Sequence, residues 1–449
     1  MGHAVGQRAD IQGLRAIAVI GVILFHVNSE YLPGGFIGVD VFFVVSGYLI
    51  TSIIFRQTDQ GNFSFRSFYL ARIKRIVPAY LALLVVISIA MAVLLTPRDF
   101  ASFEKSLHSA LYFWSNHYFA NQSDYFAPQA WELPLLHTWS LAIEMQFYLG
   151  LPLLLVVVSR RFLPLALGVI GIAFFVYSEI QLQSGEHQSM YFSLAARVPE
   201  FLIGALLVFV SVFKPNSKWS LNAIALVGVT LVLGSFLFVS EKDPFPGLYA
   251  LPACMGVAMV IFSQGSAVNR LLSVGWLVWV GTLSYSLYLW HWPILAGLRY
   301  FYQSYELPLA IISIALIFTL TVSYLSYRFV EQPFRSRYET GLKTKLVLAT
   351  LLFSAGLLII KSSSLNTGLV EPLAAERSRY AIQDEICHGK VLESCVKGDP
   401  QGSITILLMG DSHAAQLNLF ADIVGKNLGI RFEVISASSC VPIEGFDTE

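Results

Sequence analysis

Apolar stretches alternate with short polar segments through most of this 449-residue chain. Because a transmembrane helix needs about 20 predominantly apolar residues, we predict a membrane span at each of eleven stretches that approach this length. They are residues 11–27, 36–55, 78–95, 139–158, 162–177, 199–213, 221–239, 248–262, 276–298, 307–327 and 346–360. The pattern predicts an all-α polytopic membrane bundle of about ten helices, plus an eleventh helix that links the bundle to a C-terminal tail.

The composition agrees with this class. Hydrophobic residues make up 55% of the chain and charged residues only 13%, against about 25% charged residues in soluble domains. The formal net charge of zero gives no indication of a nucleic-acid partner, and the lipid bilayer is the expected partner. We predict that the first stretch is retained and is not a signal peptide, because it carries Arg15 and His26 and lacks a small-residue cleavage site.

Lysine and arginine residues are distributed unevenly between alternate polar segments. If the N-terminus is inside, most of them fall on inside segments, with clusters at 56–75 and 328–345, and few fall on outside loops. Cytoplasmic loops of membrane proteins carry an excess of positive charge. We therefore predict a cytoplasmic N-terminus and an extracytoplasmic tail, periplasmic or extracellular, after residue 360.

The tail changes character. Residues 361–400 are polar and predict a linker, and residues 404–436 then predict a strand, a turn, a helix and a second strand. This is the opening of an α/β domain, which the chain is too short to complete. If the tail is extracytoplasmic, Cys387 and Cys395 are a candidate disulfide, which leaves one further tail cysteine.

Ionisable residues inside the apolar stretches are the main candidates for a functional site. Arg15 and His26 are eleven residues apart, which is close to three helical turns, so they share one helix face about 16 Å apart. Such residues are costly at membrane depth and usually face the interior of a bundle. The alternative is an arginine that reaches the interface and a histidine that a neighbouring helix satisfies.

Other stretches carry similar candidates. His137, Ser140, Glu144 and Tyr148 recur at helical spacing, and so do Ser284, Tyr288 and His291. Acidic residues that ordinary helix packing explains poorly stand at three positions: Asp40, Glu144 and Glu331.

Arg72 and Arg75 lie in the first large inside loop, where an i,i+3 pair shares a face if the segment is helical. Paired guanidinium groups suit a phosphorylated ligand. The positive-inside rule explains the same two arginines without a ligand.

These motifs occur in a fixed order between residues 10 and 335. They are Arg15 and His26 with ten residues between them, Phe42-Phe43-Val44-Val45-Ser46-Gly47-Tyr48, the Arg72 and Arg75 pair, Trp139-Ser140-Leu141 followed by Glu144, and Val330-Glu331-Gln332-Pro333. The ordered set resembles the acyltransferase-3 family of membrane-bound acyltransferases. The resemblance implies an enzyme of the bacterial inner membrane that transfers an acyl group, usually acetyl from acetyl-CoA, to hydroxyl groups of a cell-envelope glycan such as O-antigen, peptidoglycan or exopolysaccharide.

In the tail, Asp411 and Ser412 belong to a Gly-Asp-Ser-His segment that resembles the first block of SGNH-type hydrolases, in which the serine is the nucleophile. Fused acyltransferase-3/SGNH proteins have this arrangement. The family's later blocks, including its Asp-x-x-His, do not follow, so we expect this half to be either truncated or inactive. The implied domains are a membrane acyltransferase-3 domain at 8–338, the eleventh span and linker at 339–400, and the first part of a truncated SGNH-like domain at 401–449.

The resemblance also implies roles for the candidate residues. Arg72 and Arg75 hold the phosphates of acetyl-CoA, and His26 is the general base, since imidazole titrates near neutrality. Asp40 or Glu144 orients His26, Arg15 stabilises the donor or a developing oxyanion, and Glu331 is a further catalytic candidate. No metal is expected. Whether acetyl passes directly to the glycan, or first to His26 or Ser412, stays open.

Two other functions fit parts of the pattern. A transporter or flippase of an envelope precursor would also use intramembrane ionisable residues, although no inverted repeat is evident. A membrane-anchored esterase would depend on Ser412 and lacks its histidine. Transfer that depends on acetyl-CoA distinguishes the acyltransferase from both.

Overall fold

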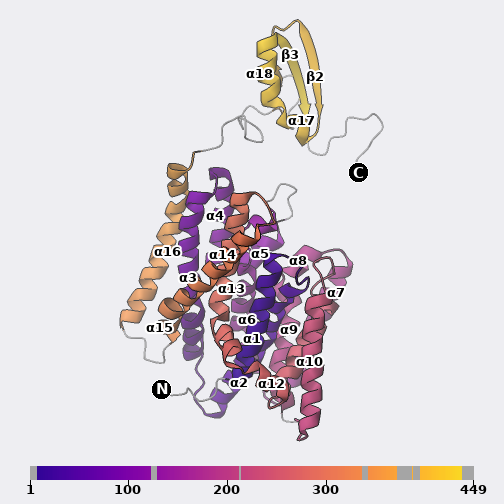
Figure 1. Cartoon of the computed structure of the whole chain (residues 1–449), viewed down its shortest axis with the longest axis vertical. Coiled ribbons are helices and arrows are strands. Elements are labelled where there is room, and N and C mark those ends of the chain that lie inside the picture. Colours follow the sequence, from indigo (N-terminus) through magenta and orange to yellow (C-terminus); the bar gives the residue numbers. More distant parts are fainter. Residues whose placement is uncertain are drawn as a thin grey trace. The chain divides into compact units, whose positions relative to one another are not determined.

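A computed structural model describes residues 8–122, 129–211, 214–335, 342–371, 387 and 395–436. The chain divides into two compact units, Met1–Val370 and Glu371–Glu449. The first is helical and the second contains the strands (Figure 1). We call them the helical unit and the tail unit.

The helical unit is built almost entirely from α-helices. They are α1 (Ala9–Val27), α2 (Gly38–Asp59), α3 (Phe65–Leu94), α4 (Pro97–Leu111), α5 (Ser115–Ala120), α6 (Thr138–Val157), α7 (Leu163–Gln183), α8 (His187–Tyr191), α9 (Leu194–Val210), α10 (Lys218–Phe238), α11 (Gly247–Phe262), α12 (Ala267–Leu272), α13 (Gly275–Tyr302), α14 (Leu309–Leu325), α15 (Gln332–Arg335) and α16 (Leu342–Leu369). Short 3-10 turns, η1 (Gly35–Ile37) and η2 (Ala130–Glu132), precede α2 and α6, and a π-helical segment, η4 (Ser326–Glu331), joins α14 to α15.

Each of the eleven predicted spans falls on a helix, although residues 212 and 213 of one span lie outside the described residues. Eight helical segments among the described residues are long and apolar enough to cross a membrane: α1, η1 with α2, α3, α6, α7, α8 with α9, α10, and α14 through α15. The other three predicted spans are α11, which is apolar but has only 16 residues, α16, which bends by 48°, and α13. The prediction of a polytopic helical bundle is therefore confirmed.

Helices α1 and α13 lie side by side in the helical unit (Figure 1). Gly281 of α13 permits this close approach, because a Cβ atom added there would lie 1.8 Å from the carbonyl oxygen of Gln12. Helices α2 and α9 approach each other in the same way. A Cβ on Gly47 would lie 1.9 Å from the Phe201 oxygen, and one on Gly204 would lie 2.0 Å from the Val44 oxygen. Small residues at helix interfaces allow backbones to pack this tightly in membranes.

Helix α3 corrects the prediction of a loop before residue 78. The helix begins at Phe65 and continues through Pro78 to Leu94. Arg72 and Arg75 therefore lie on a regular helix that extends the apolar span, and their i,i+3 spacing puts them on one face. A proline can stay inside a helix when tertiary packing supports the surrounding turns. Pro78 is buried here.

Helix α16 corrects part of the predicted linker. It reaches Leu369, so residues 361–369 are helical, whereas residues 372–386 and 388–394 lie outside the described residues. The amide of Asn366 donates to the carbonyl oxygens of Ala92 (3.0 Å) and Leu95 (2.8 Å), which lie at the C-terminal end of α3. These bonds satisfy two carbonyl groups that the end of a helix leaves unpaired, and they keep the polar stretch helical.

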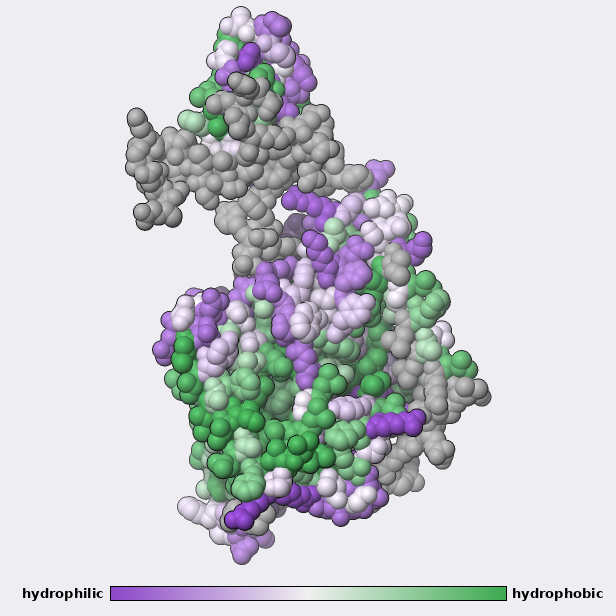
Figure 2. Space-filling model, turned by 180° about the vertical axis from the view of Figure 1, so that it is seen from behind, coloured by the Kyte–Doolittle hydropathy of each residue, from purple (hydrophilic) through white to green (hydrophobic). Residues whose placement is uncertain are grey.

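Hydrophobic side chains gather in a broad band across the helical unit, and hydrophilic side chains lie above and below this band (Figure 2). Large apolar residues are exposed on α7, α10 and α14, for example Leu165, Phe238 and Ile317. An exposed apolar surface of this extent is expected of a protein surrounded by lipid.

The tail unit contains β1 (Val396–Gly398), β2 (Ile404–Gly410), α17 (Ser412–Gln416), α18 (Asn418–Leu428) and β3 (Ile430–Ser436). Strand β3 pairs parallel with β2 and antiparallel with β1. The parallel β2–α18–β3 unit confirms the predicted opening of an α/β domain. Strand β1 was not predicted, because three residues carry too little pattern.

The predicted disulfide between Cys387 and Cys395 is not formed. Both residues are buried in one small cluster with Ala421, Phe432 and Val434, but the thiol of Cys395 is free. Cys440, the third cysteine of the tail, lies outside the described residues.

Candidate active site

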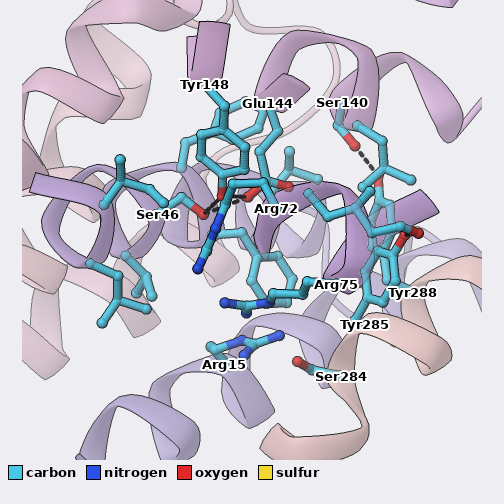
Figure 3. Close-up of a pocket in the computed structure, with 18 residues that line it drawn as sticks. Arg15, Ser46, Arg72, Arg75, Ser140, Glu144, Tyr148, Ser284, Tyr285 and Tyr288 are labelled. Atoms are coloured by element: carbon cyan, nitrogen blue, oxygen red, sulfur yellow. Dashed lines mark hydrogen bonds between the residues drawn. The ribbon is translucent and has the colours of Figure 1, made fainter. Parts of the chain in front are cut away.

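Three arginines converge on a cavity of about 70 Å³ inside the helical unit (Figure 3). Arg15 comes from α1, and Arg72 and Arg75 come from the shared face of α3. Among the described residues none of the three forms an ion pair or a hydrogen bond, and the buried Nε atom of Arg72 has no partner. We call this space the arginine cavity. Its guanidinium groups are available to an anionic ligand, because no described carboxylate forms an ion pair with any of them.

One carboxylate, Glu144 of α6, lines the arginine cavity. Its Oε1 atom accepts hydrogen bonds from the Ser46 hydroxyl at 2.6 Å and from the Tyr148 hydroxyl. The Tyr148 and Ser46 hydroxyl oxygens lie 3.2 Å apart, so the three side chains form a closed set between α2 and α6 (Figure 3). The two hydroxyl groups fix Glu144, which forms no ion pair with the arginines among the described residues.

A second and larger cavity, of about 520 Å³, is lined by residues near the other end of α1. His26 and His137 face it, and both ring nitrogens of the buried His137 lack a hydrogen-bond partner among the residues that the structure describes. We call it the histidine cavity. Carboxylates also line it, at Glu241 and Asp243, and burial raises the pKa of Glu241. The remaining lining is largely aromatic: Phe25, Phe36, Trp131, Trp139, Tyr191, Phe192, Phe245, Tyr288, Trp292 and Tyr305.

Val39 and Tyr288 line both cavities and therefore form the wall between them. The Tyr288 hydroxyl lies 2.6 Å from the Ser140 hydroxyl and donates to the carbonyl oxygen of His137 at 3.1 Å. These bonds tie α13 to α6 at the wall.

The predicted pair Arg15 and His26 is divided between the two cavities. Both residues lie on α1, as the spacing requires, but Arg15 faces the arginine cavity and His26 faces the histidine cavity. A single helix therefore carries one candidate residue on each side of the Val39–Tyr288 wall.

Asp40 does not contact His26. Its carboxylate accepts a hydrogen bond from Arg197 at 2.8 Å, and Arg197 also bonds Glu200 at 3.2 Å. All three side chains are buried, and the guanidinium group lies over the rings of Trp139, Tyr191 and Phe245. The proposed role of Asp40 in orienting His26 therefore does not agree with the structure, and neither does that of Glu144, which bonds Ser46 and Tyr148. Asp40 instead neutralises the buried Arg197.

Asp40, Glu200 and Cys254 bring atoms of metal-ligand type within 4.8 Å of one another. Arg197 already bonds both carboxylates of this group. A cation at this position would compete with the guanidinium group for the same oxygens, so the residues fit a buried ion-pair cluster better than a metal centre.

Glu331 lines neither cavity. It is buried, bonds Arg335 at 2.8 Å, and accepts a hydrogen bond from Ser286 at 3.1 Å. These contacts join the π-helical segment to α13. Glu331 thus lies between helices, outside the lining of both cavities, but close enough to Arg15 to interact with it electrostatically.

In the tail unit, Ser412 begins α17, and Asp411 stands before it. The Asp411 carboxylate accepts a hydrogen bond from the His413 backbone N–H at 2.8 Å, which lowers the pKa of Asp411. Ser412 therefore follows a strand at the start of a helix, as the resemblance to the first SGNH block implies, and Asp411 acts as the N-cap of that helix.

Some candidates were placed on helix faces by their spacing but were given no role. His291, Tyr288 and Ser284 share one face of α13, and Tyr288 and Ser284 line the arginine cavity, whereas His291 lines neither cavity. The polar stripe on α6 was a similar signal for His137. The sequence could place these residues on helix faces, but it could not show which faces meet.

The polytopic helical bundle holds two cavities on either side of a thin wall. One cavity is cationic, and the other is lined by histidines and aromatic rings. This arrangement suits a membrane enzyme that joins two substrates. A family model described as an acyltransferase domain matches residues 8–328, and one described as an SGNH domain fused to such domains matches residues 379–449. The chain therefore belongs to the acyltransferase-3 family. This membership favours the acyltransferase hypothesis over the transporter.

The chain is similar to O-acetyltransferase OatA of Staphylococcus aureus. It is 33% identical to the proteins of strains NCTC 8325 / PS 47, COL and MRSA252, over 73% of this chain and 57% of each relative. The chain thus spans less than two thirds of the length of these relatives. No solved structure matches it.

Proposed function

We propose that this protein transfers an acetyl group from acetyl-CoA on the cytoplasmic side of a bacterial inner membrane to a hydroxyl group of a cell-envelope glycan on the other side. One observation carries the proposal: Arg15, Arg72 and Arg75 converge on one cavity with no ion-pair or hydrogen-bond partner among the described residues. Val39 and Tyr288 separate this cavity from the one that His26 lines. Family membership and the similarity to O-acetyltransferases support the reaction class.

The arginine cavity is the proposed donor site. Phosphate groups match the forks of guanidinium groups, and the unpartnered Nε of Arg72 leaves a buried donor for such a ligand. In this proposal Arg72 and Arg75 bind the phosphates, and Arg15, deeper along α1, stabilises negative charge at the thioester. The excess of positive charge around the same end of the bundle supports its cytoplasmic orientation.

The histidine cavity is the proposed acceptor site. Its volume of about 520 Å³ suits a ligand of several rings better than water alone. The carboxylates of Glu241 and Asp243 can accept hydrogen bonds from hydroxyl groups, and the aromatic rings offer flat apolar faces. This combination supports a glycan acceptor. O-antigen, peptidoglycan and exopolysaccharide all carry the required hydroxyl groups.

The reaction itself needs one base and one leaving group. His26 accepts the proton of the acceptor hydroxyl as its oxygen attacks the thioester carbonyl. The new C–O ester bond forms, the C–S bond breaks, and the thiolate of coenzyme A takes up a proton after it leaves. The acetyl group must pass Val39 and Tyr288, which lie between the proposed donor and acceptor sites. If the acetyl group passes first to a serine of the tail unit and then to the glycan, Ser412 is the candidate for this intermediate acceptor.

The test is transfer of label from radioactive acetyl-CoA to envelope polysaccharide in membranes that contain the native chain, His26→Ala, or Arg72→Ala with Arg75→Ala. Arg66→Ala is the matched control, because Arg66 lies on the same helix but is exposed and outside the cavity. We expect label with the native chain and the control and a loss in the other two variants. Loss of label transfer in the arginine variant alone would show that His26 is not the base. A well-folded native chain that transfers no label would contradict the proposal.

A further inference from the structure

His26 is held by three contacts from α13. Its Nδ1 atom lies 3.0 Å from Nε2 of His291. Its backbone carbonyl oxygen accepts a hydrogen bond from Arg299 at 2.7 Å, two turns further along the same helix. The ring of Trp292 packs against the imidazole with the two ring centroids 4.5 Å apart. The main chain and the ring of His26 are therefore both fixed from one neighbouring helix.

His291 lies behind His26 and does not line the histidine cavity. It is 1% exposed, and no described carboxylate pairs with it. The other titratable side chains around its ring are His137 and Tyr288, with ring centroids at 6.1 and 5.5 Å. Because an unpaired charge is costly in a buried position, the neutral imidazole is the favoured form of His291.

The hydrogen bonds determine which nitrogen of each ring carries the proton. Nδ1 of His291 lies 3.0 Å from the carbonyl oxygen of Leu287, which can only accept. In neutral His291 the proton is therefore on Nδ1, and Nε2 is the acceptor. His26 must then donate from Nδ1, which leaves the lone pair of a neutral His26 on Nε2. No described group bonds that Nε2 atom, and His26 lines the histidine cavity.

We infer that His291 is the positioning residue for His26, because its Nε2 fixes the His26 tautomer and ring orientation so that Nε2 of His26 faces the acceptor. This inference rests on the proposed function. When Nε2 of His26 takes the hydroxyl proton, the imidazolium keeps its Nδ1–H bond to His291. That bond is then charge-assisted and stronger than before, so it stabilises the charge that develops during the reaction.

Glutamine and methionine at position 291 separate this role from packing. The two side chains are unbranched, similar in size and similar in helix propensity. The amide oxygen of His291→Gln can accept the Nδ1–H bond of His26, whereas the thioether of His291→Met accepts weakly. We expect the Met variant to lose kcat by about 100-fold, in the range attributed to a general base, and the Gln variant to keep most of it. KM for acetyl-CoA should stay unchanged in both, because the arginine cavity is not altered.

A second measurement does not need activity. In purified protein labelled with ¹⁵N-histidine, the His26 signals are identified by their loss in His26→Ala. We expect a proton on Nδ1 in the native chain and in His291→Gln, and a mixture of tautomers in His291→Met.

Equal activity in the Gln and Met variants, whether retained or lost, would overturn the inference. So would a proton on Nε2 of His26 in the native chain. A native chain with the expected tautomer but without acetyl transfer would instead overturn the proposed function, so the two failures can be told apart.

Discussion

The hydroxyl groups of Ser140 and Tyr288 lie 2.6 Å apart and join α6 to α13 at the wall between the two cavities. Tyr288 lines both cavities, and its hydroxyl also bonds the carbonyl oxygen of His137. The tyrosine is thus fixed at the point that an acetyl group must pass in the proposed function. In the proposed reaction this wall separates the thioester from water in the larger cavity.

Removal of the wall should uncouple the donor from the acceptor. In Tyr288→Ala the ring that separates the cavities is lost, so water can reach the thioester. We expect acetyl-CoA hydrolysis without glycan to rise and transfer to glycan to fall, measured by release of free thiol and by labelled product. Tyr324→Ala is the control, because Tyr324 is exposed on α14. Unchanged hydrolysis in Tyr288→Ala would show that the wall does not limit access of water.

Arg197 should contribute much more to stability than an exposed arginine with a similar ion pair. Arg197→Met leaves Asp40 and Glu200 buried without a cation, which costs about 3–5 kcal/mol. Arg160 bonds Asp59 at 2.6 Å with both side chains about half exposed, and such pairs contribute about 0–1 kcal/mol. Thermal unfolding in detergent should show a large fall in Tm for Arg197→Met and a small one for Arg160→Met. Equal falls in Tm for the two variants would contradict the conclusion that burial makes the Arg197 ion pairs more important for stability.

The close packing of α2 on α9 should not tolerate a methyl group. A Cβ on Gly47 would lie 1.9 Å from the Phe201 oxygen, so Gly47→Ala should destabilise the helical unit by at least about 1–3 kcal/mol. Gly168 on α7 has no atom within 4 Å of such a Cβ. Gly168→Ala should therefore stabilise the protein by about 0.5–1 kcal/mol through its helix propensity. Tm and the yield of folded protein measure both effects, and a neutral Gly47→Ala would show that the helices can separate.

The end of α3 should depend on a side chain that lies far away in the sequence. Asn366→Leu removes two hydrogen bonds to the carbonyl oxygens of Ala92 and Leu95 and places an apolar group against them. We expect a loss of about 1–3 kcal/mol and faster proteolysis between α16 and the tail unit. Thr350→Leu on the exposed side of α16 is the control. Equal proteolysis of the two variants would argue against this anchoring.

The sequence by itself determined the class of the protein and the position of most helices. Long apolar stretches must pair their backbone groups internally in lipid, so they form helices whatever their neighbours are. For the same reason, periodicity alone placed Arg15 and His26 on one face, and also Ser284, Tyr288 and His291. The order of the motifs was enough to identify the family.

Only the tertiary structure decided which faces meet. Local spacing cannot show that Asp40 bonds Arg197, that Glu144 bonds Ser46, or that the ring of His26 meets His291, because these partners are far apart in the sequence. It also cannot show that Arg15 and His26 face different cavities. A side chain near a helix end has several possible neighbours, and close packing of whole helices selects one of them.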